Sequence, residues 1–375
     1  MKRTLNVGIA AGGTAGHVNP ALALAEELRE RGHNIMFYGE TRRLEGRLVP
    51  QAGFDFTPVS VSGFDRSRPW TLVTALAAMR REERRIAASF SAEGGFRPDV
   101  AVGFGAYVEL PLVRAAARCS VPVVLHEQNS VPGLANKESA RTASVIAIAQ
   151  PSVEQVFASK KGPSTRIVFT GNPVRASVLA GDRSRGRAAL GIPEDATVVL
   201  VFGGSLGAHH LNMALAGLKD ELLSREGVYV VHATGESDFD ECSSALALAD
   251  GERERYRLLP YIDDMGDKLA AADLVVSRSG ASSVAEIAAL AVPSVLVPYP
   301  HATADHQTTN ARFLTEAGAA VMVPDAELDA PAFAETVLGI VDDAERRAHM
   351  RERAASLGQA GAASRLADAV ESAVA

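Results

Sequence analysis

The amino-acid sequence predicts an α/β protein made of two doubly wound domains, each with a parallel sheet and helices on its faces. The first observation is a short apolar strand, a glycine-rich turn and an amphipathic helix within residues 7–28 (VGIAAGGTAGHVNPALALAEEL). The second is a further copy of this construction within residues 198–218 (VVLVFGGSLGAHHLNMALAGL). A unit repeated at the start of each half of a chain points to two similar domains. Strands that alternate with helices in both halves are typical of parallel sheets.

Composition and charge exclude several classes of protein. The chain has 375 residues, 47% apolar and 22% charged, which suits two soluble domains better than one. A formal net charge of −7 argues against a general nucleic-acid binder. Two distant cysteines, Cys119 and Cys242, fit a reducing compartment. The apolar start is cut short by Gly12 and Gly13, so we expect no signal peptide, and no run approaches the ~20 apolar residues of a membrane span.

The strands and helices expected along the chain follow hydrophobic periodicity. In the first half we expect strands at residues 7–11, 33–38, 54–61, 98–103, 121–125 and 145–149, one further strand before residue 170, and helices over residues 15–28 and 70–90. In the second half we expect strands at residues 198–202, 228–233, 257–259, 274–277 and 295–297, and helix over residues 345–374. We place the domains at residues 1–172 and 173–360, with a polar boundary run near residues 181–187. A C-terminal helix at residues 361–375 is a candidate to pack back on the first domain.

The first glycine turn (residues 12–16) has two interpretations. Its glycines allow close backbone approach to a bound group, and the following helix start offers N–H donors to an anion. The alternative is a tight turn with no ligand. His17 and Asn19 lie at the mouth of the turn, where the carboxyl end of a strand faces a ligand crevice. These two side chains and the second copy of the turn favour a binding site.

The helix expected over residues 70–90 carries a basic cluster in an acidic protein. Arg80, Arg81, Arg84 and Arg85 gather near its end, and Trp70 stands at its start. One interpretation is a core-packed helix with a solvated basic end, which the helix dipole favours. The other is contact with anionic lipid headgroups. The sequence leaves both open.

Further polar clusters follow expected strands. His126, Glu127, Gln128 and Asn129 come directly after one strand; His126 alone is typical of a core histidine, and Asn129 is the better site candidate. Residues 277–283 (SRSGASS) precede a helix that Ser282 or Ser283 is expected to cap, and Glu286 lies one turn inside it. A pyrophosphate at these amides, with a sugar hydroxyl on the carboxylate, is the physical interpretation. The tripeptide Asp238–Phe239–Asp240 has a metal-binding pattern, but its acidic surroundings favour a solvated stretch.

Several of these segments together resemble a known family. GGTAGHVNPALALAEEL, HEQNSVPGLANK, TGNPVR, GGSLGA, YIDDM, SRSGASSVAEIA and DHQTTNA occur in the order found in the MurG family of peptidoglycan glycosyltransferases. The resemblance covers nearly the whole chain. It implies a GT-B fold, with two Rossmann-like domains facing a cleft, the donor mostly in the C-terminal half and the acceptor in the N-terminal half.

The resemblance also implies an activity. It predicts inverting transfer of N-acetylglucosamine from UDP-N-acetylglucosamine to the C4 hydroxyl of undecaprenyl-diphosphate-linked N-acetylmuramyl-pentapeptide. It places the protein at the cytoplasmic face of the cell membrane as a peripheral enzyme, with the anionic membrane surface as a partner. No cofactor, metal or nucleic acid is expected. His17 resembles the family's proposed general base, and the chemistry agrees, because a histidine with a near-neutral pKa suits removal of the acceptor proton.

The remaining site residues are carried over by position. Tyr107 and Glu127 are expected on the acceptor side; Ala15 stands where many members have glycine, and the acceptor loop reads GFGAYVELP here. Arg175 and the amides near Ser282 and Ser283 are expected to stabilise the leaving UDP. The donor contacts implied by the resemblance are Thr14, Ala15, Gly16, Asn129, Arg175, Ser205, Ile262, Ala281, Ser282, Ser283, Val284, Ala285, Glu286 and Gln307.

Three other functions compete with this interpretation. An NAD-dependent oxidoreductase fits Glu40 at the end of the second strand, but the turn lacks G-x-G-x-x-G and the second glycine turn has no purpose there. A UDP-N-acetylglucosamine 2-epimerase shares the fold and the donor but needs no acceptor surface. A non-catalytic nucleotide-sugar sensor would bind the donor without turnover. None of the three accounts for HEQNSVPGLANK as well.

Overall fold

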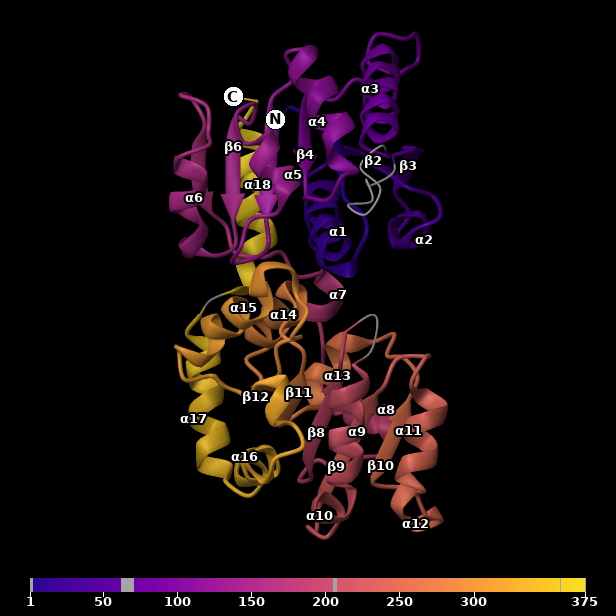
Figure 1. Cartoon of the computed structure of the whole chain (residues 1–375), viewed down its shortest axis with the longest axis vertical. Coiled ribbons are helices and arrows are strands. Elements are labelled where there is room, and N and C mark those ends of the chain that lie inside the picture. The colour runs from indigo at the N-terminus through magenta and orange to yellow at the C-terminus, as the bar shows by residue number, and fades with distance from the viewer. Residues whose placement is uncertain (1–2, 62–70, 205–207, 358, 375) are drawn as a thin grey trace. The chain divides into compact units, whose positions relative to one another are not determined.

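The computed structural model of the chain describes residues 3–61, 71–204, 208–357 and 359–374. The chain divides into two compact units. The N-terminal unit contains the residues up to Arg175 and those from Gly361 onwards, and the C-terminal unit spans Ala176–Ala360. Figure 1 labels most of the helices and strands of both units.

The N-terminal unit is built on a seven-stranded sheet in the order β3-β2-β1-β4-β5-β6-β7, in which neighbouring strands pair in parallel. The strand order reverses between β1 and β4. In open α/β sheets, ligands bind outside the carboxyl ends of the strands at this switch point. The strands are β1 (Asn6–Ala10), β2 (Asn34–Gly39), β3 (Asp55–Pro58), β4 (Val100–Gly103), β5 (Val123–Glu127), β6 (Val145–Ile148) and β7 (Arg166–Phe169).

Both faces of this sheet are buried, because successive residues of a strand point to opposite sides. Val100 and Val102 of β4 pack into one apolar cluster with α1 and α18, whereas Ala101 packs into the other. The helices of this unit are α1 (Ala15–Glu30), α2 (Leu44–Gln51), α3 (Thr71–Ser89), α4 (Glu109–Arg118), α5 (Leu134–Ser139), the short η1 (Pro151–Val153), α6 (Glu154–Ala158), η4 (Gln359–Gly361), which begins two residues before the unit boundary, and α18 (Ala362–Ser372).

The C-terminal unit repeats this plan with a six-stranded parallel sheet in the order β10-β9-β8-β11-β12-β13. Its order reverses between β8 and β11, so the loops after these strands flank a second switch point. The strands are β8 (Thr197–Phe202), β9 (Val228–Ala233), β10 (Tyr256–Leu259), β11 (Leu274–Ser277), β12 (Ser294–Leu296) and β13 (Ala320–Met322). The predicted fold class is confirmed.

The helices of the C-terminal unit cover its sheet and build an apolar core that includes Leu211, Leu215, Phe333 and Met350. They are α7 (Ala176–Leu179), α8 (Arg183–Leu190), α9 (His209–Gly217), α10 (Lys219–Leu223), α11 (Phe239–Leu246), α12 (Asp250–Arg253), α13 (Met265–Ala271), α14 (Ala281–Ala289), η2 (Thr303–Asp305), α15 (His306–Thr315), η3 (Asp325–Glu327), α16 (Pro331–Val341) and α17 (Ala344–Ala355).

Two segments differ from the sequence-based expectation. The segment over residues 345–374 is not one continuous helix but α17 and α18, and each packs into a different core: Met350 in the C-terminal unit, Leu366 and Val370 in the N-terminal unit. The polar run at residues 181–187 belongs largely to α8 and is folded into the C-terminal unit. Its polarity comes partly from Arg187, whose side chain is fully buried.

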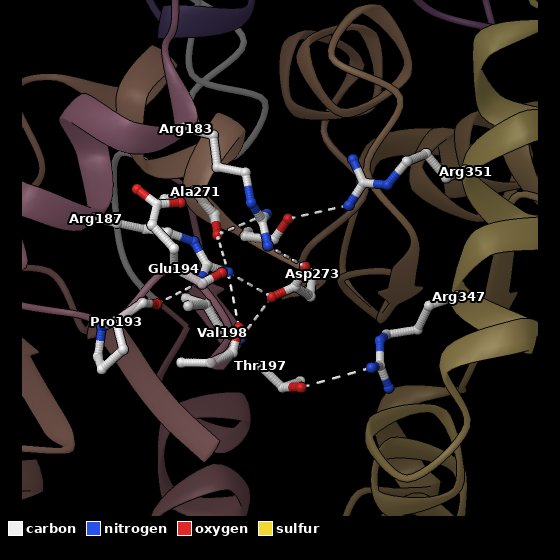
Figure 2. Close-up of polar contacts among 12 residues, drawn as sticks. Arg183, Arg187, Pro193, Glu194, Thr197, Val198, Ala271, Asp273, Arg347 and Arg351 are labelled. Carbon is white, nitrogen blue, oxygen red and sulfur yellow. Dashed lines mark hydrogen bonds and ion pairs between the residues drawn. The ribbon is translucent and has the colours of Figure 1, made fainter. Parts of the chain in front are cut away.

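Arg187 lies at the centre of a charged cluster beneath the C-terminal sheet. Its guanidinium donates to Asp273 at 2.8 Å and to the carbonyls of Pro193 and Ala196 at 2.6 and 2.9 Å. Figure 2 shows Arg183, Arg347 and Arg351 turned toward the same region. Arg347 donates to the carbonyls of Ile340 and Val341 at the end of α16, and Arg351 to those of Ala272 and Ala291 after α13 and α14. These arginines therefore satisfy helix C-terminal carbonyls, which attract positive charge.

Candidate active site

The glycine turn after β1 is hydrogen-bonded to a buried carboxylate. Glu45, whose side chain is almost fully buried, accepts hydrogen bonds from the amides of Gly13 at 3.1 Å and Glu40 at 3.2 Å. A Cβ on Gly12 would collide with this carboxylate. Gly13 has a φ of +86°, in the left-handed region that favours glycine. Glycine is thus required at position 12 because Glu45 occupies the space of a Cβ, and it is favoured at position 13 because the turn needs a positive φ there.

His17 lies in the first turn of α1, at the mouth of the switch point between β1 and β4. Thr14 immediately precedes α1, and its Oγ1 lies 3.1 Å from Nδ1 of His17. The imidazole is half-buried and packs against the loop after β4, because a Cβ on Gly105 would lie 3.3 Å from its Nε2. One imidazole nitrogen is therefore oriented by a hydroxyl, while Nε2 faces the loop at the crevice.

The loop of residues 103–107 forms the other side of this switch point. Gly105 and Ala106 have φ values of +86° and +66°, and Tyr107 is 41% exposed. The amide of Gly105 donates to Oε2 of Glu109 at 2.5 Å. Burial raises the pKa of Glu109 to about 8, against the lowering effect of the Gly105 hydrogen bond, and Glu127 adds to the rise. Tyr107, predicted on the acceptor side, is thus carried on a loop anchored by a buried acid.

Glu127, the second predicted acceptor-side residue, is buried and organises the loop after β5. Its carboxylate accepts from the Asn129 amide at 3.0 Å, the Gly133 amide at 2.9 Å and the Asn136 side chain at 2.9 Å. Burial raises the pKa of Glu127, and these hydrogen bonds oppose the rise. The side chain of Asn129, a predicted donor contact, is half-buried and lies 3.4 Å from the same carboxylate.

Two further residues of the N-terminal unit bear on the site. Nε2 of His126 lies 3.1 Å from the Gly171 carbonyl, and burial lowers the pKa of His126 to about 4, so the ring is a neutral donor in the core. Arg175, the predicted stabiliser of the leaving group, pairs with Glu26 of α1 at 3.0 Å. Ala15 and Gly16 are the first residues of α1, next to Thr14.

The C-terminal unit presents the start of α14 at its own switch point. The helix begins at Ala281 after Gly280, which gives no side-chain cap, so the expected capping by Ser282 or Ser283 is wrong. The helix starts earlier than the serines suggest because Gly280 already adopts the extended N-cap conformation. The hydroxyl of Ser282 is buried, and none of the residues that the structure describes gives it a hydrogen-bond partner. A buried polar atom of this kind at a helix N-terminus fits an anionic ligand.

Hydrogen bonds hold this segment to the loop after β12. Ser279 donates to the backbone carbonyl of Gln307 at 2.8 Å, and Gln307 accepts from the Tyr299 amide at 2.9 Å through its side chain. Arg278 is buried and donates to the carbonyls of Val297 and Pro298 at 3.3 and 3.2 Å. The predicted donor contacts at residues 281–286 and Gln307 therefore belong to one connected region.

An ion network supports the same region from α9, the helix that follows the second glycine turn. Arg278 pairs with Asp325 at 2.5 Å, and His210 of α9 lies 2.9 Å from Asp325 and 3.2 Å from Asp329. Burial alone would raise the pKa of Asp325, but hydrogen bonds from His210 and Arg278 lower it; the Asp325 hydrogen bond in turn raises the pKa of His210. Gly204 in the glycine turn has a φ of +90°, close to that of Gly13.

The other predicted donor residues are more scattered. Ile262 is buried in the loop after β10; Val284 and Ala285 are buried in α14, where Glu286 is half-buried. Ser205 lies outside the described residues. Asp238 already accepts from Asn212 at 2.9 Å, and Asp240 is exposed in the first turn of α11.

Helix α3 carries the predicted membrane contacts, except Trp70, which lies outside the described residues. Arg80, Arg81 and Arg84 line a hollow of about 370 Å³ with Ala77. Arg85 is tied to Glu82 at 2.8 Å and to the Pro58 carbonyl at 2.5 Å. On the same helix Val73 and Leu76 are 71% and 41% exposed. Among the described helices, none has the length and hydrophobicity of a membrane span.

Sequence reasoning missed the acids that shape the site. Glu45 and Glu109 were not singled out, because charged side chains are rarely buried. The only available signal was their proximity to glycine-rich turns, where a missing Cβ leaves room for a carboxylate. Arg278 and Asn136 lay inside quoted motifs, but nothing in the sequence distinguished them from their neighbours.

Comparison with known proteins identifies the family. Residues 7–148 match the glycosyltransferase family 28 N-terminal domain, and residues 198–369 match the C-terminal domain of the same family. The chain is 40% identical, over 375 residues, to a UDP-N-acetylglucosamine--N-acetylmuramyl-(pentapeptide) pyrophosphoryl-undecaprenol N-acetylglucosamine transferase of Desulforudis audaxviator, with 98% of each chain covered. It is 36% identical to a protein of the same name from Acetivibrio thermocellus, again over 98% of each.

Solved structures agree with this assignment. The crystal structure of MurG from Acinetobacter baumannii superposes with a TM-score of 0.72 at 27% identity and covers 98% of this chain and 99% of that one. A putative UDP-N-acetylglucosamine 2-epimerase from Listeria monocytogenes reaches a TM-score of 0.70 at 15% identity, which shows a shared fold alone. The chain therefore belongs to glycosyltransferase family 28 and, within it, to the N-acetylglucosaminyltransferases of the MurG type.

Proposed function

We propose that this chain transfers N-acetylglucosamine from UDP-N-acetylglucosamine to the C4 hydroxyl of undecaprenyl-diphosphate-linked N-acetylmuramyl-pentapeptide, with inversion at C1, in peptidoglycan biosynthesis. The names of relatives that match it along almost their whole length support this activity. The observation that carries the mechanism is the hydroxyl-oriented imidazole of His17 at a sheet switch point.

His17 acts as the general base. When Nδ1–H donates to Thr14 Oγ1, Nε2 is the basic nitrogen of the imidazole and the atom that accepts the proton in this mechanism. The C4 oxygen of the muramyl residue attacks C1 of N-acetylglucosamine, the bond between C1 and the β-phosphate oxygen breaks, and the C4 proton passes to Nε2. One in-line displacement inverts the anomeric centre, and UDP leaves with the negative charge.

The leaving diphosphate binds at the start of α14. The amides of its first turn and the Ser282 hydroxyl offer donors, and the helix dipole favours negative charge there. Donors fixed before the reaction stabilise the developing charge without reorganisation. Arg175 contributes only if its guanidinium leaves or shares its pairing with Glu26.

The same protein docks on the cytoplasmic face of the membrane through α3. Exposed Val73 and Leu76 supply apolar contact, and Arg80, Arg81 and Arg84 supply charge. Basic residues near an anionic lipid surface contribute roughly 1 kcal/mol each. Sedimentation with vesicles of phosphatidylglycerol and phosphatidylcholine tests this: replacing the three arginines by glutamine is expected to abolish binding at low salt. Binding that is unchanged by these substitutions and by salt would contradict it.

The activity is tested with radiolabelled UDP-N-acetylglucosamine and a short-chain lipid-linked muramyl-pentapeptide, with and without EDTA. Label entering the lipid product in both samples establishes a transferase without an obligatory metal. Transfer lost only with EDTA directs attention to Asp238 and Asp240. Conversion of the free nucleotide sugar without transfer would favour an epimerase, and donor binding without turnover would favour a sensor.

A further inference from the structure

Glu109 is a buried acid next to the acceptor-side loop, and the reaction proposed above does not use it. It is the first residue of α4, and its side chain is fully buried. Its Oε2 accepts from the Gly105 amide at 2.5 Å, and its Oε1 lies 3.4 Å from the Ser139 hydroxyl of α5. A Cβ on Gly103 would lie 2.5 Å from Oε2, so the last residue of β4 has to be small for the carboxyl to fit there.

The loop that Glu109 anchors has an uncommon conformation. Gly105 and Ala106 both lie in the left-handed region, with φ values of +86° and +66°. L side chains rarely adopt this conformation, and it persists where surrounding contacts over-determine it. The hydrogen bond from Gly105 to Glu109 is such a contact, because it comes from the residue directly before Ala106.

Gly105, the residue whose amide Glu109 holds, lies next to the imidazole of His17. A Cβ on Gly105 would lie 3.3 Å from both Nε2 and Cδ2 of His17, and 3.6 Å from the Asn136 amide nitrogen. Gly105 therefore lies beside the imidazole, and the ring occupies the space that a side chain at this position would need. A displacement of this loop changes both the space around Nε2 and the direction in which Tyr107 is presented.

We propose that Glu109 is a positioning residue for the acceptor side: by holding the Gly105 amide, it fixes the loop of residues 103–107 against His17. This inference rests on the proposed function, because the position of the loop affects turnover only if His17 acts on the acceptor. Glu109 itself touches no reacting atom.

The charges around Glu109 give the positioning a pH dependence. Glu127 on β5 is its charged neighbour, and Ser139 on α5 is a neutral one. His17 on α1 lies beside Gly105, and Glu45 on α2 lies beside Gly12. Burial keeps His126 on β5 neutral. Burial, with a contribution from Glu127, raises the pKa of Glu109 to about 8. Ionisation of Glu109 strengthens the Gly105 hydrogen bond but places a charge in a buried site next to Glu127. The raised pKa means that the site as a whole disfavours the charged form, so we expect the anchor to loosen above pH 8.

The test compares Glu109→Gln, Glu109→Ala and the exposed control Glu30→Gln, with kcat and both KM values measured from pH 6.5 to 9.5. Glutamine imitates the protonated acid and is expected to keep activity at pH 7 while removing the loss of acceptor kcat/KM above pH 8. Alanine removes the acceptor of the Gly105 hydrogen bond and is expected to lower acceptor kcat/KM by about tenfold or more at every pH. The donor KM is expected to stay unchanged in all variants.

Two results would overturn the inference: an alkaline loss in Glu109→Gln equal to that of the wild type, or an acceptor kcat/KM in folded Glu109→Ala equal to that of Glu30→Gln. Wild-type protein without any transfer would refute the proposed function instead.

The position of the loop is measured separately, by the protection of the Gly105 amide from hydrogen exchange. We expect protection to fall in Glu109→Ala, and in the wild type above pH 8, but not in Glu109→Gln. Equal protection of the Gly105 amide in the wild type, Glu109→Ala and Glu109→Gln would refute the positioning role of Glu109.

Discussion

The hydroxyl of Thr14 lies 3.1 Å from Nδ1 of His17, three residues further along the chain. Thr14 has the extended backbone of an N-cap residue, yet its side chain makes no capping hydrogen bond to α1. An N-cap threonine ordinarily satisfies a helix amide. Here the hydroxyl lies within hydrogen-bond distance of an imidazole instead.

This relationship predicts a graded effect on turnover. Thr14→Val keeps the shape and removes the hydrogen bond, so the tautomer protonated on Nδ1 is no longer favoured, and kcat is expected to fall about tenfold. His17→Ala removes the base and is expected to lower kcat by about 10²–10⁴-fold. Thr14→Ser is the matched control and should retain turnover. Undiminished kcat in His17→Ala would remove the base assignment.

Ser282→Ala is expected to separate stability from donor binding. The hydroxyl is buried without a partner, so its removal should leave thermal stability unchanged or raise it slightly. If the diphosphate accepts a hydrogen bond from this hydroxyl, the donor KM should rise about tenfold, since a hydrogen bond to a charged group contributes about 1.5–3 kcal/mol. Ser356→Ala, exposed after α17, is the control. A destabilised variant with an unchanged donor KM would contradict the assignment.

Asp273 balances the buried charge of Arg187, and its loss is expected to destabilise the C-terminal unit. Asp273→Asn leaves a guanidinium that is fully buried without its carboxylate, at a cost of about 3–5 kcal/mol. The matched change Asp342→Asn breaks the more exposed pair with Arg225 and should cost about 1 kcal/mol or less. Urea unfolding measures both, and similar losses in the two variants would argue against the central role of Asp273.

Two buried histidines predict a loss of stability in mild acid. Burial lowers the pKa of His126 to about 4 and that of His232 to about 3, whereas an unfolded histidine titrates near 6.5. Between these values the unfolded chain binds protons that the folded chain does not. Stability contributed by the neutral rings is therefore present above pH 6.5 and is lost as the pH falls toward 4, by about 1.4 kcal/mol per pH unit per histidine.

His232→Gln tests this slope. Nδ1 of His232 lies 2.9 Å from the Tyr256 hydroxyl and Nε2 lies 3.1 Å from Asn212 Oδ1, and a glutamine amide can both accept and donate in the same way. Urea midpoints at pH 7 and pH 5 should differ less in this variant than in the wild type. The exposed control His349→Gln should keep the wild-type difference. A variant slope equal to that of the wild type would refute the contribution of His232.

Hydrophobic pattern and turn chemistry were enough to predict the fold class and most strands. The predicted strands at residues 228–233 and 274–277 coincide with β9 and β11, because both are continuous apolar runs. The three-residue edge strand β13 was missed, since Ala320–Met322 is too short to show a period. Glu45 could not be recognised because its partner amide at Gly13 is 32 residues away, and only packing brings the two together.

The arrangement of α18 has a consequence for biosynthesis of the chain. Leu366, Ala367, Ala369 and Val370 complete a core whose other buried members lie in the first half of the sequence. Arg31, directly after α1, donates hydrogen bonds to Ser364, Asp368 and Glu371. A ribosome releases these partners after the whole of the C-terminal unit. The N-terminal unit therefore begins to emerge first but completes its folding last. By then the whole C-terminal unit has already been synthesised. Until then its exposed apolar face is a natural substrate for chaperones.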